Sequence, residues 1–78
     1  MTTPSDIEQW ITQNLDTEYA AVEGDGHHFE ATVVSACFEG QSTLKRHRLV
    51  YAALGDKMQD AIHALSLHTF TPAEYQSK

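Results

Sequence analysis

A Gly-Asp-Gly turn at residues 24–26 separates two runs, 17–23 and 28–37, that are rich in Tyr, Val, Thr and Phe. Two such runs around a glycine turn are typical of a β-hairpin. Alternation along the second strand gives two faces, one with Phe29, Ala31 and Val33 and the other with His28, Glu30 and Thr32. We expect the first face to line the core, His28 to point away from it, and His27 to lie at the turn.

Helices are predicted at both ends of the chain. Ser5 and Glu8 match a capping box before apolar residues at helical spacing, so the first helix is expected from about Asp6 to Leu15. Near the C-terminus, Thr71 is a suitable N-cap for a short helix from 72 to about 76.

A further helix is predicted from about Thr43 to Gly55. Its apolar face is expected to contain Leu44, Leu49, Val50, Ala53 and Leu54. Its first turns carry a basic cluster, Lys45, Arg46, His47 and Arg48, and cations at this end of a helix oppose its dipole. The cluster is either a solvated face or a binding surface, and the sequence favours neither.

The segment 60–70 is predicted to be a third strand. Alternation places His63, Leu65 and Leu67 on one face, and Ile62, Ala64, Ser66 and His68 on the other. The elements then follow the order α-β-β-α-β-α within one domain, residues 1–78. This order predicts an α+β fold in which a small three-stranded sheet has helices packed mainly on one face.

The composition of the chain argues against several classes of function. The net charge of −6 argues against general affinity for nucleic acid, although three of the five Lys and Arg residues lie together at 45–48. The chain has one cysteine, no secretory signal and no apolar run long enough to cross a membrane, so we expect a cytoplasmic protein. Scattered carboxylates and the absence of a phosphate-binding glycine loop predict that it is not an enzyme.

The remaining chemistry lies in Cys37 and the histidines. Cys37 follows a strand among apolar neighbours, which favours a small packing residue over a nucleophile. His63 and His68 should point to opposite faces and so not share a metal. His63 with the turn pair His27 and His28 offers two or three imidazole ligands, too few for a closed site. Such a partial site needs a second molecule, and the alternative is a set of ordinary structural histidines.

Four motifs resemble the BolA-like family, in its short-loop bacterial branch. They are VVS..FEG at 33–40, KRHRLVY at 45–51, IHAL at 62–65 and TPAE at 71–74. The resemblance covers about residues 5 to 75. It implies a class II KH-like fold with a mixed sheet and the order α-β-β-α-α-β-α, which leaves room for an extra short helical turn near 40–43.

The resemblance also implies a partner and a cofactor. Proteins of this family form a heterodimer with a monothiol (CGFS-type) glutaredoxin and share a [2Fe–2S] cluster with it, for iron–sulfur trafficking or iron and redox sensing. The partner supplies a cysteine and a bound glutathione, and the BolA-like chain supplies the histidine of IHAL, here His63, with a loop residue. We favour His27 as that residue, with His28 as the alternative. The isolated chain is then expected to bind no cluster and to be a monomer or a weak dimer.

The alternative that the resemblance implies is a DNA-binding transcriptional regulator. The helix 43–55 would carry the phosphate contacts, Lys45, Arg46 and Arg48. Nucleic-acid-binding KH domains use a GxxG loop between two helices, whereas the segment 39–44 has one glycine, Gly40. A helix-turn-helix-like mode would therefore be needed.

Overall fold

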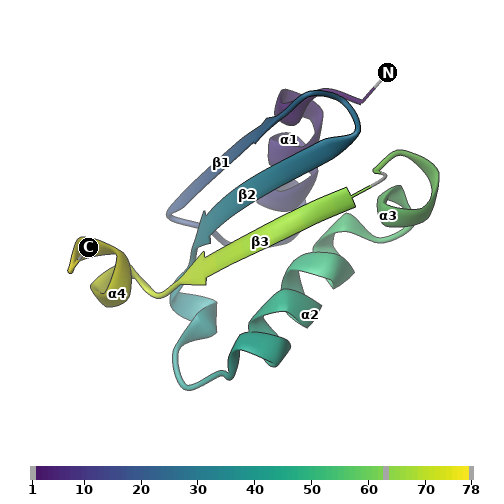
Figure 1. The fold of residues 1–78 in the computed structure, drawn as a ribbon. Helices are drawn as coiled ribbons and strands as arrows, with labels where there is room; N and C mark the ends of the chain where they lie inside the picture. The colour runs from purple at the N-terminus through teal and green to yellow at the C-terminus, as the bar shows by residue number, and fades with distance from the viewer. Residues whose placement is uncertain (1, 63, 78) are drawn as a thin grey trace.

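The computed structural model describes residues 2–62 and 64–77, and it contains a three-stranded mixed sheet (Figure 1). The strands are β1 (Tyr19–Gly24), β2 (His28–Val34) and β3 (Ala64–Phe70), in the order β1-β2-β3. β1 and β2 are antiparallel, and β2 and β3 are parallel. The predicted α+β fold is confirmed.

The core forms where two helices cover one face of this sheet. Phe29, Ala31 and Val33 on β2 have no exposed surface, which confirms the predicted core face. They pack in one cluster with buried residues from the neighbouring strand, the helices and the segment before β3: Ile7, Ile11, Val22, Phe38, Val50, Leu54 and Ile62. The alternating pattern of β2 therefore decides which face of the sheet packs against the helices.

Helix α1 (Pro4–Asn14) begins two residues earlier than predicted, because a different pair of residues caps it. The Thr3 hydroxyl accepts from the Asp6 N–H at 3.2 Å, and the Asp6 carboxylate accepts from the Thr3 N–H at 3.0 Å. Pro4 occupies the first helical turn, where a missing N–H costs nothing. The predicted capping box of Ser5 and Glu8 is therefore wrong.

Helix α2 (Thr43–Leu54) has the predicted extent, with Gly55 at its C-cap. Its buried side is narrower than expected. Val50 and Leu54 are buried, whereas Leu44 is 60% exposed and Leu49 is 37% exposed. The prediction of Leu44 and Leu49 as core residues is wrong, because α1 and the sheet contact the opposite side of α2.

Two short helices flank α2. The 3₁₀ helix η1 (Ala36–Phe38) replaces the end of the second predicted strand, and α3 (Lys57–Asp60) lies between α2 and the third, which begins four residues later than predicted, at Ala64. The side chain of Ser35 accepts from the Cys37 N–H at 3.1 Å and donates to the Asp16 carbonyl at 2.6 Å, which ends β2. No helical turn lies at 40–42, so the position predicted for the extra turn is wrong; the extra helices are η1 before α2 and α3 after it.

Helix α4 (Pro72–Gln76) has the predicted bounds and a capping box between Thr71 and Glu74. The Arg46 guanidinium donates to both oxygens of the Glu74 carboxylate, at 2.7 and 3.1 Å. These bonds tie the last helix to α2. Among the helices described, none is long and apolar enough to cross a membrane.

The Glu74 side chain makes fold stability depend on pH. The hydrogen bonds from Arg46 lower the pKa of this carboxyl from its ordinary value of 4.5 to about 2. A lowered folded-state pKa stabilises the fold above the unfolded value, and this contribution is lost as pH falls through the folded value. We expect Glu74→Gln, which keeps the capping geometry, to destabilise the protein at neutral pH and the difference from wild type to close between about pH 4.5 and 2.

Urea unfolding midpoints measured across this pH range test the prediction. Glu39→Gln, which removes an exposed carboxylate in the loop before α2, is the matched control and should run parallel to wild type. A Glu74→Gln difference that stays constant down to pH 2 would contradict the assigned role of the ion pair.

Candidate functional site

The β1–β2 turn is held by the side chain of Asp25. One carboxylate oxygen accepts from the backbone N–H groups of His27, at 2.9 Å, and His28, at 3.0 Å. These two bonds lower the pKa of the Asp25 carboxyl. A side chain at Gly24 would collide with the His28 carbonyl oxygen and the Phe29 ring. The Gly-Asp-Gly sequence therefore fixes the path of the two histidines.

Both turn histidines are exposed, as predicted. His27 lies in the turn and His28 is the first residue of β2, on the face away from the core. The Nε2 atom of His28 lies 3.5 Å from the Ser66 hydroxyl on β3. The His28 imidazole therefore lies over the sheet, whereas His27 precedes the first residue of β2.

Strand pairing brings the start of β3 to the same end of the sheet as this turn. His28 is in register with Ala64, the first residue of β3. His63, the predicted ligand that precedes Ala64 in the sequence, lies outside the described residues. Within 2–62 and 64–77, no group of three His, Cys, Asp or Glu side chains is placed to hold a metal ion. The imidazoles described at this end are those of His27 and His28.

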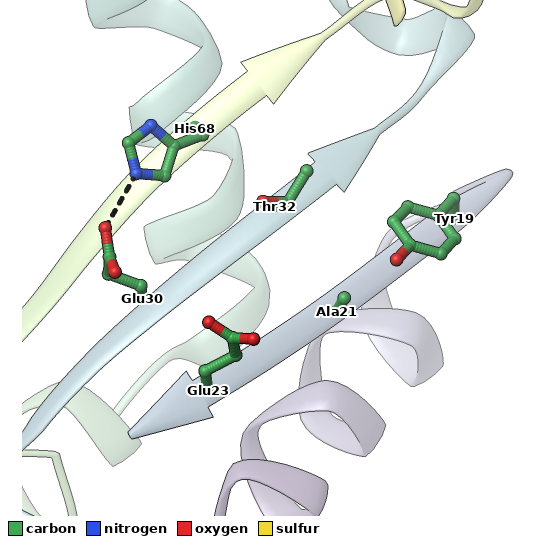
Figure 2. A pocket seen from close by; sticks show the side chains of 6 residues that line it. All are labelled: Tyr19, Ala21, Glu23, Glu30, Thr32 and His68. Carbon is green, nitrogen blue, oxygen red and sulfur yellow. Dashed lines mark hydrogen bonds and ion pairs between the residues drawn. The ribbon is translucent and has the colours of Figure 1, made fainter. Parts of the chain in front are cut away.

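The face of the sheet opposite the core carries a second polar group, which the sequence did not predict. His68 Nε2 lies 3.2 Å from a Glu30 carboxylate oxygen, and Figure 2 shows this pair beside Glu23 across the strands. A depression of about 340 Å³ lies over these residues and is also lined by Tyr19 and Thr32. His68 shares a face with Ser66, as alternation predicted, and this is the face that carries His28 and Glu30. Strand alternation also placed Glu30 on the face away from the core, but only the β2–β3 register shows that the two side chains meet.

The basic cluster of α2 is divided by its contacts. Besides Glu74, Arg46 donates to the Gln41 carbonyl at 2.9 Å and lies over the Phe38 ring, 6.0 Å from its centroid. Its side chain is 13% exposed. Lys45 and Arg48 are exposed on the other side of the helix. Of the three cations predicted as phosphate contacts, Arg46 is engaged within the chain.

Cys37 is exposed, so the prediction of a packing residue is wrong. The chain leaves β2 at Ser35 and turns into η1, which puts Phe38 rather than Cys37 into the core. Cys37 and Gln41 line a depression of about 390 Å³ with the exposed residues of α2. Periodicity missed this because a 3₁₀ turn does not follow the alternation of a strand.

Comparison with protein families decides what kind of chain this is. The model of a family described as BolA-like protein matches residues 11–74. The chain belongs to the BolA-like family. A solved structure of a BolA protein homologue from Coxiella burnetii is 58% identical in sequence. It superposes with a TM-score of 0.87 over 97% of this chain and 99% of that one.

Two curated relatives differ in their names and in how much of their length matches this chain. The "DNA-binding transcriptional regulator BolA" of Haemophilus influenzae is 33% identical, over 92% of this chain and 80% of the relative. Human "BolA-like protein 1" is 45% identical over 82% of this chain, and the match spans 47% of the human protein. The chain thus spans about half the length of this human relative.

The role of Asp25 in ordering this turn can be tested directly. We expect Asp25→Ala to remove both carboxylate bonds and so to speed amide hydrogen exchange at His27 and His28, with Val22 and Phe29 in the flanking strands little changed. Amide exchange followed by NMR is the measurement. Glu23→Ala, which removes a carboxylate from the adjacent strand, should leave His27 and His28 exchanging as in wild type. Equal effects of the two substitutions would show that Asp25 does not hold the turn.

Proposed function

We propose that this BolA-like chain is a non-enzymatic adaptor that forms a heterodimer with a monothiol glutaredoxin and shares a [2Fe–2S] cluster with it. His63 and one histidine of the β1–β2 turn would be its ligands, with His27 favoured over His28. The observation that carries the proposal is the end of the sheet where an Asp25-ordered pair of exposed histidines meets the start of β3. The family membership supports it.

The donor set fits a shared site better than a closed one. Imidazoles from one chain leave the remaining positions to the partner's cysteine and glutathione thiolates. Histidine in place of thiolate makes the potential of such a cluster less negative. The ligating rings must be neutral to bind, so the complex should weaken as pH falls through the range in which histidine protonates.

The two turn histidines differ in where the backbone places them. The ring of His28 stands on the polar face of β2 near Ser66, whereas His27 lies beyond the end of the strand. A ligand that must reach a second protein is better placed beyond the sheet than beside it. This supports His27.

Single histidine substitutions test the proposal. We expect His63→Ala to abolish the visible circular dichroism of the mixed heterodimer, formed by adding the protein to a glutathione-loaded glutaredoxin cluster. His27→Ala should change that spectrum strongly and His28→Ala weakly. His68→Ala is the matched control, because His68 pairs with Glu30 on the sheet face.

Three outcomes would count against the proposal. A wild-type spectrum from His63→Ala would remove its central residue. No effect of either turn histidine would exclude the turn as a ligand. A stronger effect of His28→Ala would exchange the roles of the pair.

A DNA-binding regulator is the second candidate, favoured by the name of the Haemophilus relative and by the exposure of Lys45 and Arg48. Arg46, held by Glu74, is not counted as a free phosphate contact. Binding would then rely on two cations of α2 in an otherwise acidic chain.

The salt dependence of DNA affinity shows whether two or three cations contact phosphates. Two phosphate contacts predict a slope of log affinity against log salt of roughly −1.8, and three predict roughly −2.7. Fluorescence anisotropy with duplex DNA measures it. Lys45→Ala with Arg48→Ala should abolish the dependence, whereas Lys57→Ala, on α3, should not. Affinity that does not respond to salt would exclude this function.

A further inference from the structure

The outward side of α2 combines apolar and basic side chains. Leu44, Lys45, Arg48 and Leu49 are all exposed there, and we call these four residues the α2 outer face. Positions three and four apart lie on the same side of a helix, so the leucines and the cations are neighbours. A helix that serves only to cover the core would carry polar residues at these positions.

The cations of the α2 outer face are distinct from the other described cations. Arg46 is paired with Glu74, and Lys57 lies over the Trp10 ring at 5.1 Å from its centroid. Across residues 2–62 and 64–77, Lys45 and Arg48 are therefore the cationic side chains without an ion pair or ring contact. Two adjacent free cations stand out in a chain of net charge −6.

The α2 outer face is also hollowed. A depression of about 390 Å³ runs between η1 and α2, lined by Cys37, Gln41, Lys45, Arg48 and Leu49. Its volume can admit an aliphatic side chain, and Lys45 and Arg48 are among its lining residues. A depression that combines apolar surface with charged side chains is typical of a protein-binding groove.

We propose that the α2 outer face docks an acidic amphipathic segment of another protein. An aliphatic side chain of that segment enters the depression beside Leu49. Its carboxylates pair with Lys45 and Arg48, and Leu44 extends the apolar contact. Charge complementarity favours an acidic partner. Lys45 and Arg48 make this groove locally positive, although the protein as a whole has a net charge of −6.

Two other occupants fit the face less well. Duplex DNA would meet the cations but would leave two leucines against phosphates and water. A second copy in a two-fold dimer would place Lys45 and Arg48 of one chain against the same residues of the other. Such like charges across an interface are unfavourable.

This surface is separate from the histidine end. The β1–β2 turn precedes β2, whereas η1 and the start of α2 follow it, so the two regions lie at opposite ends of β2 (Figure 1). The inference therefore does not rest on the proposed cluster. Both surfaces could be occupied together.

The test is an NMR titration of the ¹⁵N-labelled protein with a short helical peptide that has leucines on one side and glutamates flanking them. We expect shift changes at Cys37, Gln41, Lys45, Arg48 and Leu49, with Gly24–His28 unchanged. Lys45→Glu with Arg48→Glu should weaken binding by about tenfold or more, since two exposed ion pairs are lost and charge reversal adds repulsion. Leu44→Ser with Leu49→Ser should weaken it similarly.

The controls separate charge from position. Lys57→Glu alters the charge on α3 and should bind like wild type, and His27→Ala should also bind like wild type whatever its effect on the cluster. The same peptide with lysines in place of glutamates should not bind. No shift changes at millimolar peptide, equal binding of the lysine peptide, tighter binding of duplex DNA at the same residues, or a self-dimer through α2 would each overturn the proposal.

Discussion

The parallel pairing of β2 with β3 is the constraint on which the other features depend. Parallel neighbours need a crossover, and η1, α2 and α3 provide it while covering the core face of β2. The same register places Ala64 opposite His28 and, at the other end, lets the Phe70 carbonyl accept from the Ser35 N–H at 3.0 Å. One ladder thus sets where the histidine turn meets β3 and where β2 ends.

Charge is distributed over this frame in two distinct ways. Arg46 serves the fold, since its bonds to Glu74 and Gln41 join α2 to α4 and to the preceding loop. Lys45 and Arg48, one position to either side of the Arg46–His47 pair, face outward with two leucines. Helical geometry makes this division, because neighbours in sequence lie about 100° apart around the axis. A basic motif that looks uniform in sequence therefore contains a structural residue and a surface pair.

Most of the fold was predictable from local rules, and the errors have local causes. Alternation in β2, the bounds of α2 and the capping of α4 were predicted correctly. The Thr3 cap was missed because Ser5 and Glu8 also satisfy the capping pattern, and the choice depends on where Pro4 can sit. Helix α3 was missed because four residues are too few for a helical period to appear. Leu44 and Leu49 were assigned to the core by hydropathy, which does not indicate which side of a helix is covered.

The sequence by itself indicated His27, His28 and His63 as candidate ligands, which stays a prediction, and it determined the hairpin, the core face of β2 and the bounds of α2 and α4. These follow from the stereochemistry of neighbouring residues. Only the tertiary structure decided that Arg46 bonds to Glu74, that His68 meets Glu30, and that Cys37 and the α2 outer face lie open. The partners in those two pairs are 28 and 38 residues apart in the sequence. Whether a side chain is exposed likewise depends on which distant segments of the chain pack over it. No periodicity in a short window carries that information.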